Sequence, residues 1–341
     1  MKTGMGTAPA AVLAIDGGNS KTDVVLVGTD GSVLSSARGP GTSAEAHRFE
    51  TSKVVLDDLV GAVARQAGID PAGRIAEHTS AFIAGVDLPQ EEERLAAELA
   101  TRDWSRTTRV GNDTFAVLRA GTQRPWGVGV TCGAGINCVG VAPSGELTRY
   151  LALGRFTGDW GGGLDIGVEV MWWAMRAEDG RGEATALSAA VADYFGRQTV
   201  TEVAIGIHLG EIDEDDLIRL TYVLFAVSDA GDSVAMNLVD RLADEISSMA
   251  LVAMRRLDLT GLDTELVLGG GLLMARNPRL TNGITERVHA EAPAAQVAVV
   301  DVPPIAGAAL LGLDHLGMGK PEQDRLRESY VNAGTGLQAT G

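Results

Sequence analysis

The chain has 341 residues, of which 45% are hydrophobic and 4% aromatic, with 44 glycines and a formal net charge of -17. This length predicts about two domains, and the dispersed acidic charge argues against nucleic acid or an anionic membrane as a bulk partner. No apolar run is long enough for a signal peptide or a membrane span, and two cysteines need no disulfide framework, so we expect a cytoplasmic protein.

The first predicted elements surround a glycine turn. Residues 11–15 and 24–27 are apolar and predict two buried strands, which the sequence DGGNSKT at residues 16–22 joins. Asp30 and Gly31 predict a hairpin turn into a third strand, because these residues adopt the positive φ angles that a two-residue hairpin needs.

The turn at residues 16–22 departs from two common phosphate loops. A Walker loop needs a glycine before its lysine and a helix after it, whereas Ser20 precedes Lys21 and a strand follows. A Rossmann fingerprint needs a third glycine and a helix, which this turn lacks. Two interpretations remain open: an ordinary hairpin turn, or a turn whose backbone N–H groups bind an anion while Asp16 holds a cation.

Helices and strands then alternate through the first half of the chain. The expected elements are a helix at 44–67, a strand at 79–84, a helix at 90–100, a strand at 107–110 and a helix at 115–120. Together with the three opening strands they give a βββαβαβα plan, which is typical of an α/β protein.

The second half repeats this plan from Trp126, with a glycine-rich hairpin and a largely helical insertion at 163–257. A strand at 265–268, a glycine turn, a strand at 296–301 and a closing helix at 304–316 follow. Two such lobes would bring both glycine turns to one cleft, which is where ligands usually bind.

We therefore expect an α/β fold of two similar lobes. The N-terminal lobe comprises residues 1–120 and is joined by the closing helix at 304–318. The C-terminal lobe comprises residues 121–303, and the polar residues 319–341 are expected to form a mobile tail.

Five motifs occur in one order along the chain. They are DGGNSKT at 16–22 followed by Asp30-Gly31, Asn112-Asp113, the hairpin at 127–145, GDWGGG at 158–163 and GGGL at 269–272. In this order the chain resembles the sugar kinase/Hsp70/actin superfamily, and within it the BadF/BadG-type ATPases, which include N-acetylglucosamine kinases. The resemblance covers about residues 11–316 and implies two ribonuclease-H-like (actin-like) lobes.

The resemblance implies ATP-dependent phosphorylation of a hydroxyl on an amino sugar, with N-acetylglucosamine or glucosamine as substrate and Mg²⁺ as the metal. Asp113 is expected to be the catalytic base and Asp16 the metal-binding residue. The residues expected to contact ATP are Gly17, Gly18, Asn19, Ser20, Lys21, Thr22, Gly133, Ala134, Gly135, Gly269, Gly270 and Gly271. Those expected to contact the sugar are Ser43, Asn112, Asp113, Asn137 and Asp159.

Plainer interpretations stand beside these roles. Asp113 is equally suited to cap a helix, Asp16 to form a turn, and the triple glycine at 269–271 to join a strand to a helix. For Asp159, which glycines flank, the role of sugar contact is favoured over the alternative of an ordinary loop carboxylate.

The motifs also depart from the family pattern. Ala134 and Ile136 replace the hydroxyl residues of GTGS, so the second turn would rely on backbone N–H groups and on Thr131 or Asn137. Trp160 and Gly162 replace the Glu and Ser of GDEGS.

Two further functions remain open. An activator ATPase of the same family would be a dimer that shares an iron–sulfur cluster through two cysteines per chain, but Cys132 and Cys138 lie where the pattern predicts half-buried strands. The lost hydroxyls also fit a regulator that binds a nucleotide or sugar without catalysis. A homodimer is expected, with Trp172 and Trp173 in its interface or in the core.

Overall fold

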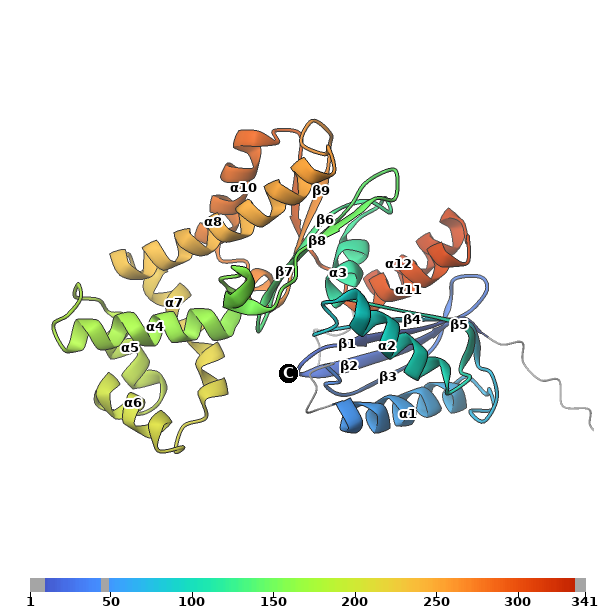
Figure 1. Cartoon of the computed structure of the whole chain (residues 1–341), viewed down its shortest axis with the longest axis horizontal. Coiled ribbons are helices and arrows are strands. Elements are labelled where there is room, and N and C mark those ends of the chain that lie inside the picture. Colours follow the sequence, from blue (N-terminus) through green and yellow to red (C-terminus); the bar gives the residue numbers. More distant parts are fainter. Residues whose placement is uncertain (1–9, 44–48, 335–341) are drawn as a thin grey trace, which may run out of the picture. The chain divides into compact units, whose positions relative to one another are not determined.

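The structure of the chain is a computed structural model, and it describes residues 10–43 and 49–334. The chain divides into two compact units (Figure 1). Unit 1 contains the residues up to Trp126 together with those from Val300 onward, and unit 2 contains Gly127–Val299. Unit 2 is therefore inserted into the sequence of unit 1, and each unit has its own five-stranded sheet.

The sheet of unit 1 has the strand order β3-β2-β1-β4-β5, in which β1 pairs antiparallel with β2 and parallel with β4. Its strands are β1 (Ala10–Gly17), β2 (Lys21–Val27), β3 (Val33–Pro40), β4 (Ala76–Ile83) and β5 (Ser105–Gly111). The helices of this unit are α1 (Phe49–Gln66), α2 (Pro89–Ala100), α3 (Asp113–Gly121), α11 (Pro304–His315) and α12 (Lys320–Gly334).

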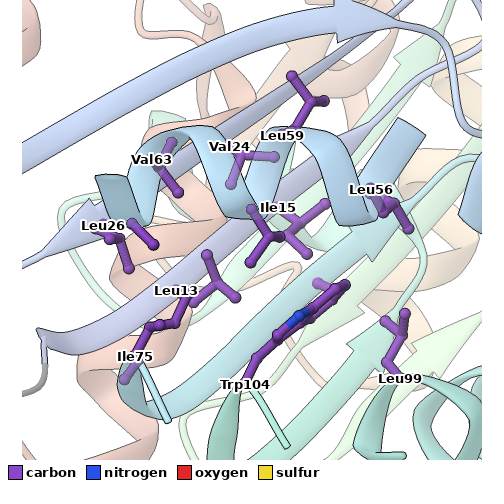
Figure 2. Packing of buried hydrophobic residues seen from close by; sticks show 14 of the residues in the cluster. Leu13, Ile15, Val24, Leu26, Leu56, Leu59, Val63, Ile75, Leu99 and Trp104 are labelled. Carbon is purple, nitrogen blue, oxygen red and sulfur yellow. The ribbon is translucent and has the colours of Figure 1, made fainter. Parts of the chain in front are cut away.

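Strand β1 is buried along its whole length, which explains why its sequence is apolar without alternation. On one face, Leu13 and Ile15 belong to a core cluster with Leu59 and Val63 of α1 and with Trp104 (Figure 2). On the other face the closing helix α11 packs against β1 and β4, and the Ser80 hydroxyl donates to the Ala308 carbonyl at 2.7 Å. The sheet thus holds the end of β1 rigidly in place.

The turn between β2 and β3 differs from the expected two-residue hairpin. Gly31 alone adopts a positive φ of 82°, and the strand register shifts between Leu26 and Val27. The turn therefore contains one residue with a left-handed backbone together with a β-bulge, whereas we expected two consecutive left-handed residues.

The helix expected at 44–67 corresponds to α1, and residues 44–48 of that prediction lie outside the described residues.

The expected mobile tail at 319–341 is wrong for residues 320–334, because they form helix α12. Residues 335–341 of that prediction lie outside the described residues. Arg325 pairs with Asp30 at 2.6 Å, and the Arg327 guanidinium donates to the Ala120 carbonyl at 3.0 Å. Gln323 accepts a hydrogen bond from the buried Arg119 at 2.8 Å. These polar contacts, rather than a large apolar face, attach the helix to unit 1.

The sheet of unit 2 has the order β10-β9-β6-β7-β8, which is the order of unit 1 read from its other edge. Its strands are β6 (Gly127–Cys132), β7 (Ile136–Val141), β8 (Leu147–Arg149), β9 (Glu265–Gly269) and β10 (Gln296–Val299). The repeated topology confirms the expected fold class of two βββαβαβα lobes.

A helical insertion follows β8 in unit 2, as expected from residues 163–257. The helices of the unit are η1 (Gly154–Thr157), α4 (Gly162–Glu178), α5 (Leu187–Tyr194), α6 (Val200–His208), η2 (Glu214–Arg219), α7 (Leu220–Asp229), α8 (Ser233–Arg256), α9 (Gly271–Met274) and α10 (Pro278–Glu291). Among the helices of residues 10–43 and 49–334, none is both long and apolar enough to cross a membrane.

A buried histidine, His78 on β4, stacks on the exposed His315 at the end of α11 in unit 1. The rings of His78 and His315 stack with centroids 4.0 Å apart, and His78 Nδ1 is 2.9 Å from the Thr107 hydroxyl. Burial, then the neighbouring His315 and Arg109, lower the pKa of His78 to about 4. His78 is therefore neutral in the folded protein at neutral pH.

The His78 pair predicts a loss of stability in acid. The unfolded chain takes up a proton near pH 6.5 and the folded chain only near pH 4, so the free energy of unfolding falls by about 3 kcal/mol as the pH drops through this window. We expect His78→Phe to remove this component when urea unfolding is measured between pH 4 and pH 8. The control is His208→Phe, which removes an exposed imidazole. Equal pH slopes for wild type and His78→Phe would contradict the prediction.

Candidate active site

The first glycine turn links β1 and β2 at the end of the most buried strand of unit 1. Gly17 ends β1 and its carbonyl accepts from the Ala84 N–H at 2.7 Å, while the Gly18 N–H donates to the Lys21 carbonyl at 2.9 Å. In the described chain, the N–H groups of Asn19 and Ser20 donate to no other residue. Two free, adjacent N–H groups at a turn form a site for an anion.

Three carboxylates surround the end of β1. Asp16 is only 8% exposed, and burial followed by the charges of Asp113 and Asp23 raises its pKa to about 7. Asp23 lies directly opposite Asp16 in the strand register and pairs with Arg38 at 2.6 Å and with Lys21 at 3.5 Å. The charge of Asp113 thus acts on Asp16, and their expected roles as base and metal-binding residue stay predictions.

The start of α3 shows which residue caps this helix, a role that the sequence left open for Asp113 beside that of catalytic base. Asn112 is the helix cap, because its side-chain oxygen accepts from the Thr114 N–H at 2.9 Å. Asp113 follows as the first helical residue, and burial raises its pKa to about 6. The capping role therefore belongs to Asn112, and the Asp113 carboxylate is not needed for it.

Asn112 itself is engaged inside the chain at both ends of its amide, since its nitrogen donates to Asp87 at 2.7 Å. This arrangement fixes the position of α3 and of Asp113. A contact between Asn112 and a sugar stays a prediction.

Hydroxyl groups lie beside the first turn. The Thr22 and Thr42 hydroxyls form a buried hydrogen bond of 2.8 Å, which ties β2 to the segment after β3. The adjacent Ser43 is 1% exposed, and its hydroxyl has no hydrogen-bond partner in the described chain. An unpaired buried hydroxyl is uncommon, and a ligand or water at this position would satisfy it.

The second glycine turn joins β6 to β7 in unit 2 and meets the start of helix α4. The Gly163 N–H donates to the Gly133 carbonyl at 2.7 Å, and the Leu164 N–H donates to the Ala134 carbonyl at 3.2 Å. The N–H groups of Ala134 and Gly135 donate to no other described residue. This turn therefore offers the same kind of anion site as the first, without the two hydroxyls of the family pattern.

Two polar side chains accompany the second turn. Thr131, near the end of β6, has a buried hydroxyl without a partner in the described chain. Asn137, opposite Thr131 in the register, accepts from the Cys138 N–H at 2.7 Å. Of the two candidates to replace the missing hydroxyls, Thr131 has the unused donor.

The triple glycine at the end of β9 lies beside the second turn, because β9 pairs with β6 and Gly269 is level with Thr131. Gly270 has a φ of 87°, and a Cβ on it would clash with the Cys132 backbone. The chain itself thus requires a glycine here. An additional contact of residues 269–271 with adenosine stays a prediction.

Asp159 follows η1 in unit 2 and is 9% exposed. The Thr157 hydroxyl donates to its carboxylate at 2.5 Å, which fixes the side chain. Trp160, which replaces the family's glutamate, is buried, and its ring lies 3.8 Å from the Arg241 guanidinium carbon. Trp160 therefore has a packing role in unit 2.

Asp23 and Arg38 are neighbours of Asp16 that were not among the residues predicted from the sequence. The sequence could have indicated Asp23, because a tight turn after Gly17 places Thr22 opposite Gly17 and Asp23 opposite Asp16. The role of Asp87 could not be found this way, since its contact with Asn112 joins segments that are 25 residues apart.

Both cysteines are free and fully buried on the strands of unit 2. Burial raises the pKa of Cys132 to about 12 and that of Cys138 further. Such thiols are neutral and lack the accessible thiolates that an iron–sulfur cluster needs.

Known proteins resemble this chain over most of its length. It is 25% identical to the N-acetylmuramic acid/N-acetylglucosamine kinase of Clostridium acetobutylicum, covering 77% of this chain and 85% of that protein. It is 22% identical to the N-acetyl-D-glucosamine kinase of Dictyostelium discoideum, covering 89% and 97%.

Solved structures share the fold. A protein of Chromobacterium violaceum, provisionally named an N-acetylglucosamine kinase, has a TM-score of 0.69 at 22% identity and covers 89% of this chain and 99% of its own. A ROK hexokinase from Thermus thermophilus has a TM-score of 0.56 at 18% identity, with coverages of 90% and 99%.

The family model described as the BadF/BadG/BcrA/BcrD ATPase family matches residues 13–312. With most of its sequence inside this match, the chain belongs to the BadF/BadG/BcrA/BcrD ATPase family.

Proposed function

We propose that the protein is an ATP-dependent kinase that phosphorylates a hydroxyl of an amino sugar, with N-acetylglucosamine or glucosamine as its substrate. The observation that carries this proposal is that Asp113, at the start of α3, is close enough to Asp16, near the end of β1, for its charge to raise the pKa of Asp16. The names of the two related kinases, from Clostridium acetobutylicum and Dictyostelium discoideum, support the choice of substrate. A homodimer and a cytoplasmic location stay predictions.

Asp113 is the proposed general base. Its pKa of about 6 leaves the carboxylate ionised at neutral pH, and it is a stronger base than an ordinary aspartate. It would accept the proton from the sugar hydroxyl as the oxygen attacks the terminal phosphorus, and the bond between that phosphorus and the bridging oxygen of ADP breaks. Asn112 positions this base through its cap of α3.

Asp16 is the proposed residue for Mg²⁺. Its carboxylate oxygens suit a hard divalent cation. No three His, Cys, Asp or Glu side chains of the described residues are grouped to hold a metal, so water and phosphate oxygens would supply the other ligands. The ion would neutralise charge on the phosphates of ATP when bound. Burial holds Asp16 in one orientation, and Arg38 keeps Asp23 in a pair beside it.

The two glycine turns are the proposed phosphate contacts. Free N–H groups of Asn19 and Ser20 in unit 1, and of Ala134 and Gly135 in unit 2, donate to phosphate oxygens without any side chain. Lys21 adds a positive charge, and the Thr131 hydroxyl replaces one that the family pattern would supply. Ser43 and Asp159 are the proposed sugar contacts with Asn112 and Asn137.

The alternative of an activator ATPase is less well supported. That function requires thiolates at a surface shared by two chains, whereas Cys132 and Cys138 are neutral and buried within one sheet. A colourless, iron-free preparation with kinase activity agrees with our proposal, and a brown iron-containing one contradicts it.

Removal of the base tests the mechanism. We expect Asp113→Asn to lower kcat by about 10²–10⁴-fold, because it removes proton transfer, while ATP affinity measured by calorimetry stays nearly unchanged. Asp58→Asn, an exposed substitution on α1, is the matched control. A fully active Asp113→Asn enzyme would mean that another group is the base.

The pH profile tests the same residue independently. Protonation inactivates a base, so kcat/KM should fall as the pH decreases through about 6. A coupled assay for ADP release between pH 5 and pH 8 measures this profile. A rate that stays constant down to pH 5 would be inconsistent with Asp113 as the base.

The substrate is tested by an ADP-release screen over N-acetylglucosamine, glucosamine, N-acetylmannosamine, N-acetylmuramate and glucose. We expect the highest kcat/KM with N-acetylglucosamine or glucosamine. A preference for glucose, or no turnover with any sugar, would contradict the proposed substrate.

A further inference from the structure

Helix α3 carries the proposed base as its first residue and is nine residues long. Its N-terminal end is held by Asn112, which caps the helix and also donates to Asp87. At the other end, the last four carbonyl groups of an α-helix have no partner within the helix. The orientation of Asp113 therefore depends on the groups that satisfy and hold the C-terminal end of α3.

The closing helix α11 packs along α3 (Figure 1). A Cβ on Gly307 of α11 would lie 1.8 Å from the Ala116 carbonyl oxygen and 2.8 Å from the Ala120 nitrogen, so this approach requires a glycine. The backbones of the two helices thus meet in the second half of α3. This contact limits movement of α3 towards α11, but it does not prevent rotation about the crossing point.

Arg327 of α12 holds the C-terminal end of α3. Its guanidinium donates to the carbonyls of Arg119 at 3.2 Å and Ala120 at 3.0 Å, and to the carbonyl of Thr122 directly after the helix. A cation among the last carbonyls of a helix also complements the negative end of the helix dipole. Carbonyls at the end of α3 are therefore satisfied by a segment that lies more than two hundred residues later in the chain.

A second link runs through the side chain of Arg119, which is 3% exposed. Its guanidinium pairs with Asp314 of α11 at 2.8 Å, and it donates to Gln323 of α12 at 2.8 Å and to the Thr122 carbonyl at 3.2 Å. The Gln323 amide in turn donates to Asp314 at 3.0 Å. One end of α3 is thus bonded to both C-terminal helices, while the other end carries Asp113.

Arg325 provides the contrast within α12. It pairs with Asp30 in the turn between β2 and β3 at 2.6 Å, and both side chains are 56% exposed. An exposed ion pair of this kind contributes little to stability. Arg325 attaches α12 to a surface turn, whereas Arg327 attaches it to the helix that carries the proposed base.

From these contacts we propose that Arg327 is a positioning residue for phosphoryl transfer. By holding the C-terminal end of α3, it keeps Asp113 in the orientation in which the carboxylate accepts the proton of the sugar hydroxyl. The inference rests on the proposed function in taking Asp113 as the base. A catalytic group that is displaced by about 1 Å lowers the rate by up to about 10²-fold, so a small tilt of α3 is sufficient to reduce turnover.

Steady-state kinetics on the full chain test this role with Arg327→Met, which keeps an unbranched stem and removes the donors. We expect kcat to fall about tenfold while KM for ATP changes less than about twofold, because the proposed phosphate contacts lie on the glycine turns. Arg327→Lys keeps a cation at this end of α3 and should recover most of the lost rate. The assays are run well below the melting temperature of each variant, so that unfolding does not contribute.

Arg325→Met is the matched control. It removes the same charge from the same helix two residues earlier and breaks an exposed pair. We expect its kcat to stay within about twofold of the wild type. Equal losses of kcat in Arg325→Met and Arg327→Met would overturn the inference, because they would trace the effect to the attachment of α12 as a whole.

Amide hydrogen exchange measures the structural step without any need for catalysis. In Arg327→Met the amides of residues 115–121 should exchange at least about fivefold faster than in the wild type, while those of α2 stay unchanged. Unchanged exchange in α3 would overturn the inference, as would a kcat of Arg327→Met within about twofold of the wild type. A wild-type protein without kinase activity would contradict the proposed function, and the exchange result would still decide whether Arg327 holds α3.

Discussion

The burial of Asp16 at the end of β1 is the constraint on which the candidate site depends. The strand is covered on both faces, so it holds this carboxylate where water is scarce and where Asp23 and Asp113 add further negative charge. Three acids in such a place repel one another unless a proton or a cation is shared among them. Burial and these neighbouring charges together raise the pKa of Asp16 to about 7, so the carboxylate is easily protonated near neutral pH.

The same topology serves two chemically different turns. In each unit a hairpin joins the central strand to its antiparallel neighbour, and each turn leaves adjacent backbone N–H groups free. Unit 1 adds carboxylates to its turn, whereas unit 2 adds the N-terminus of α4 and the backbone of residues 269–271. One repeated architecture has thus given a turn flanked by buried carboxylates and a turn of mainly backbone donors.

The strands and the glycine turns could be predicted because their signals are local. Apolar runs end at residues that favour turns. The order of the motifs singled out Asp16 and Asp113 as candidate site residues. Helix α12 could not be predicted in this way, because it lacks a pattern of apolar residues and Leu326 is its one fully buried leucine. The residues that its polar side chains contact lie far away in the sequence. Arg325 contacts Asp30 across 295 positions, and Arg327 contacts a carbonyl across 207.

The insertion of unit 2 into unit 1 has a consequence for synthesis on the ribosome. Residues 127–299 form one uninterrupted stretch, so unit 2 has all its own strands as soon as that stretch has emerged. Unit 1 lacks α11 until residues 304–315 have been synthesised. Until then, one face of β1 and β4 is without the helix that covers it. The nascent N-terminal sheet therefore waits, with apolar surface exposed, while almost two hundred further residues are translated, and this interval is when a chaperone would be most useful to the chain.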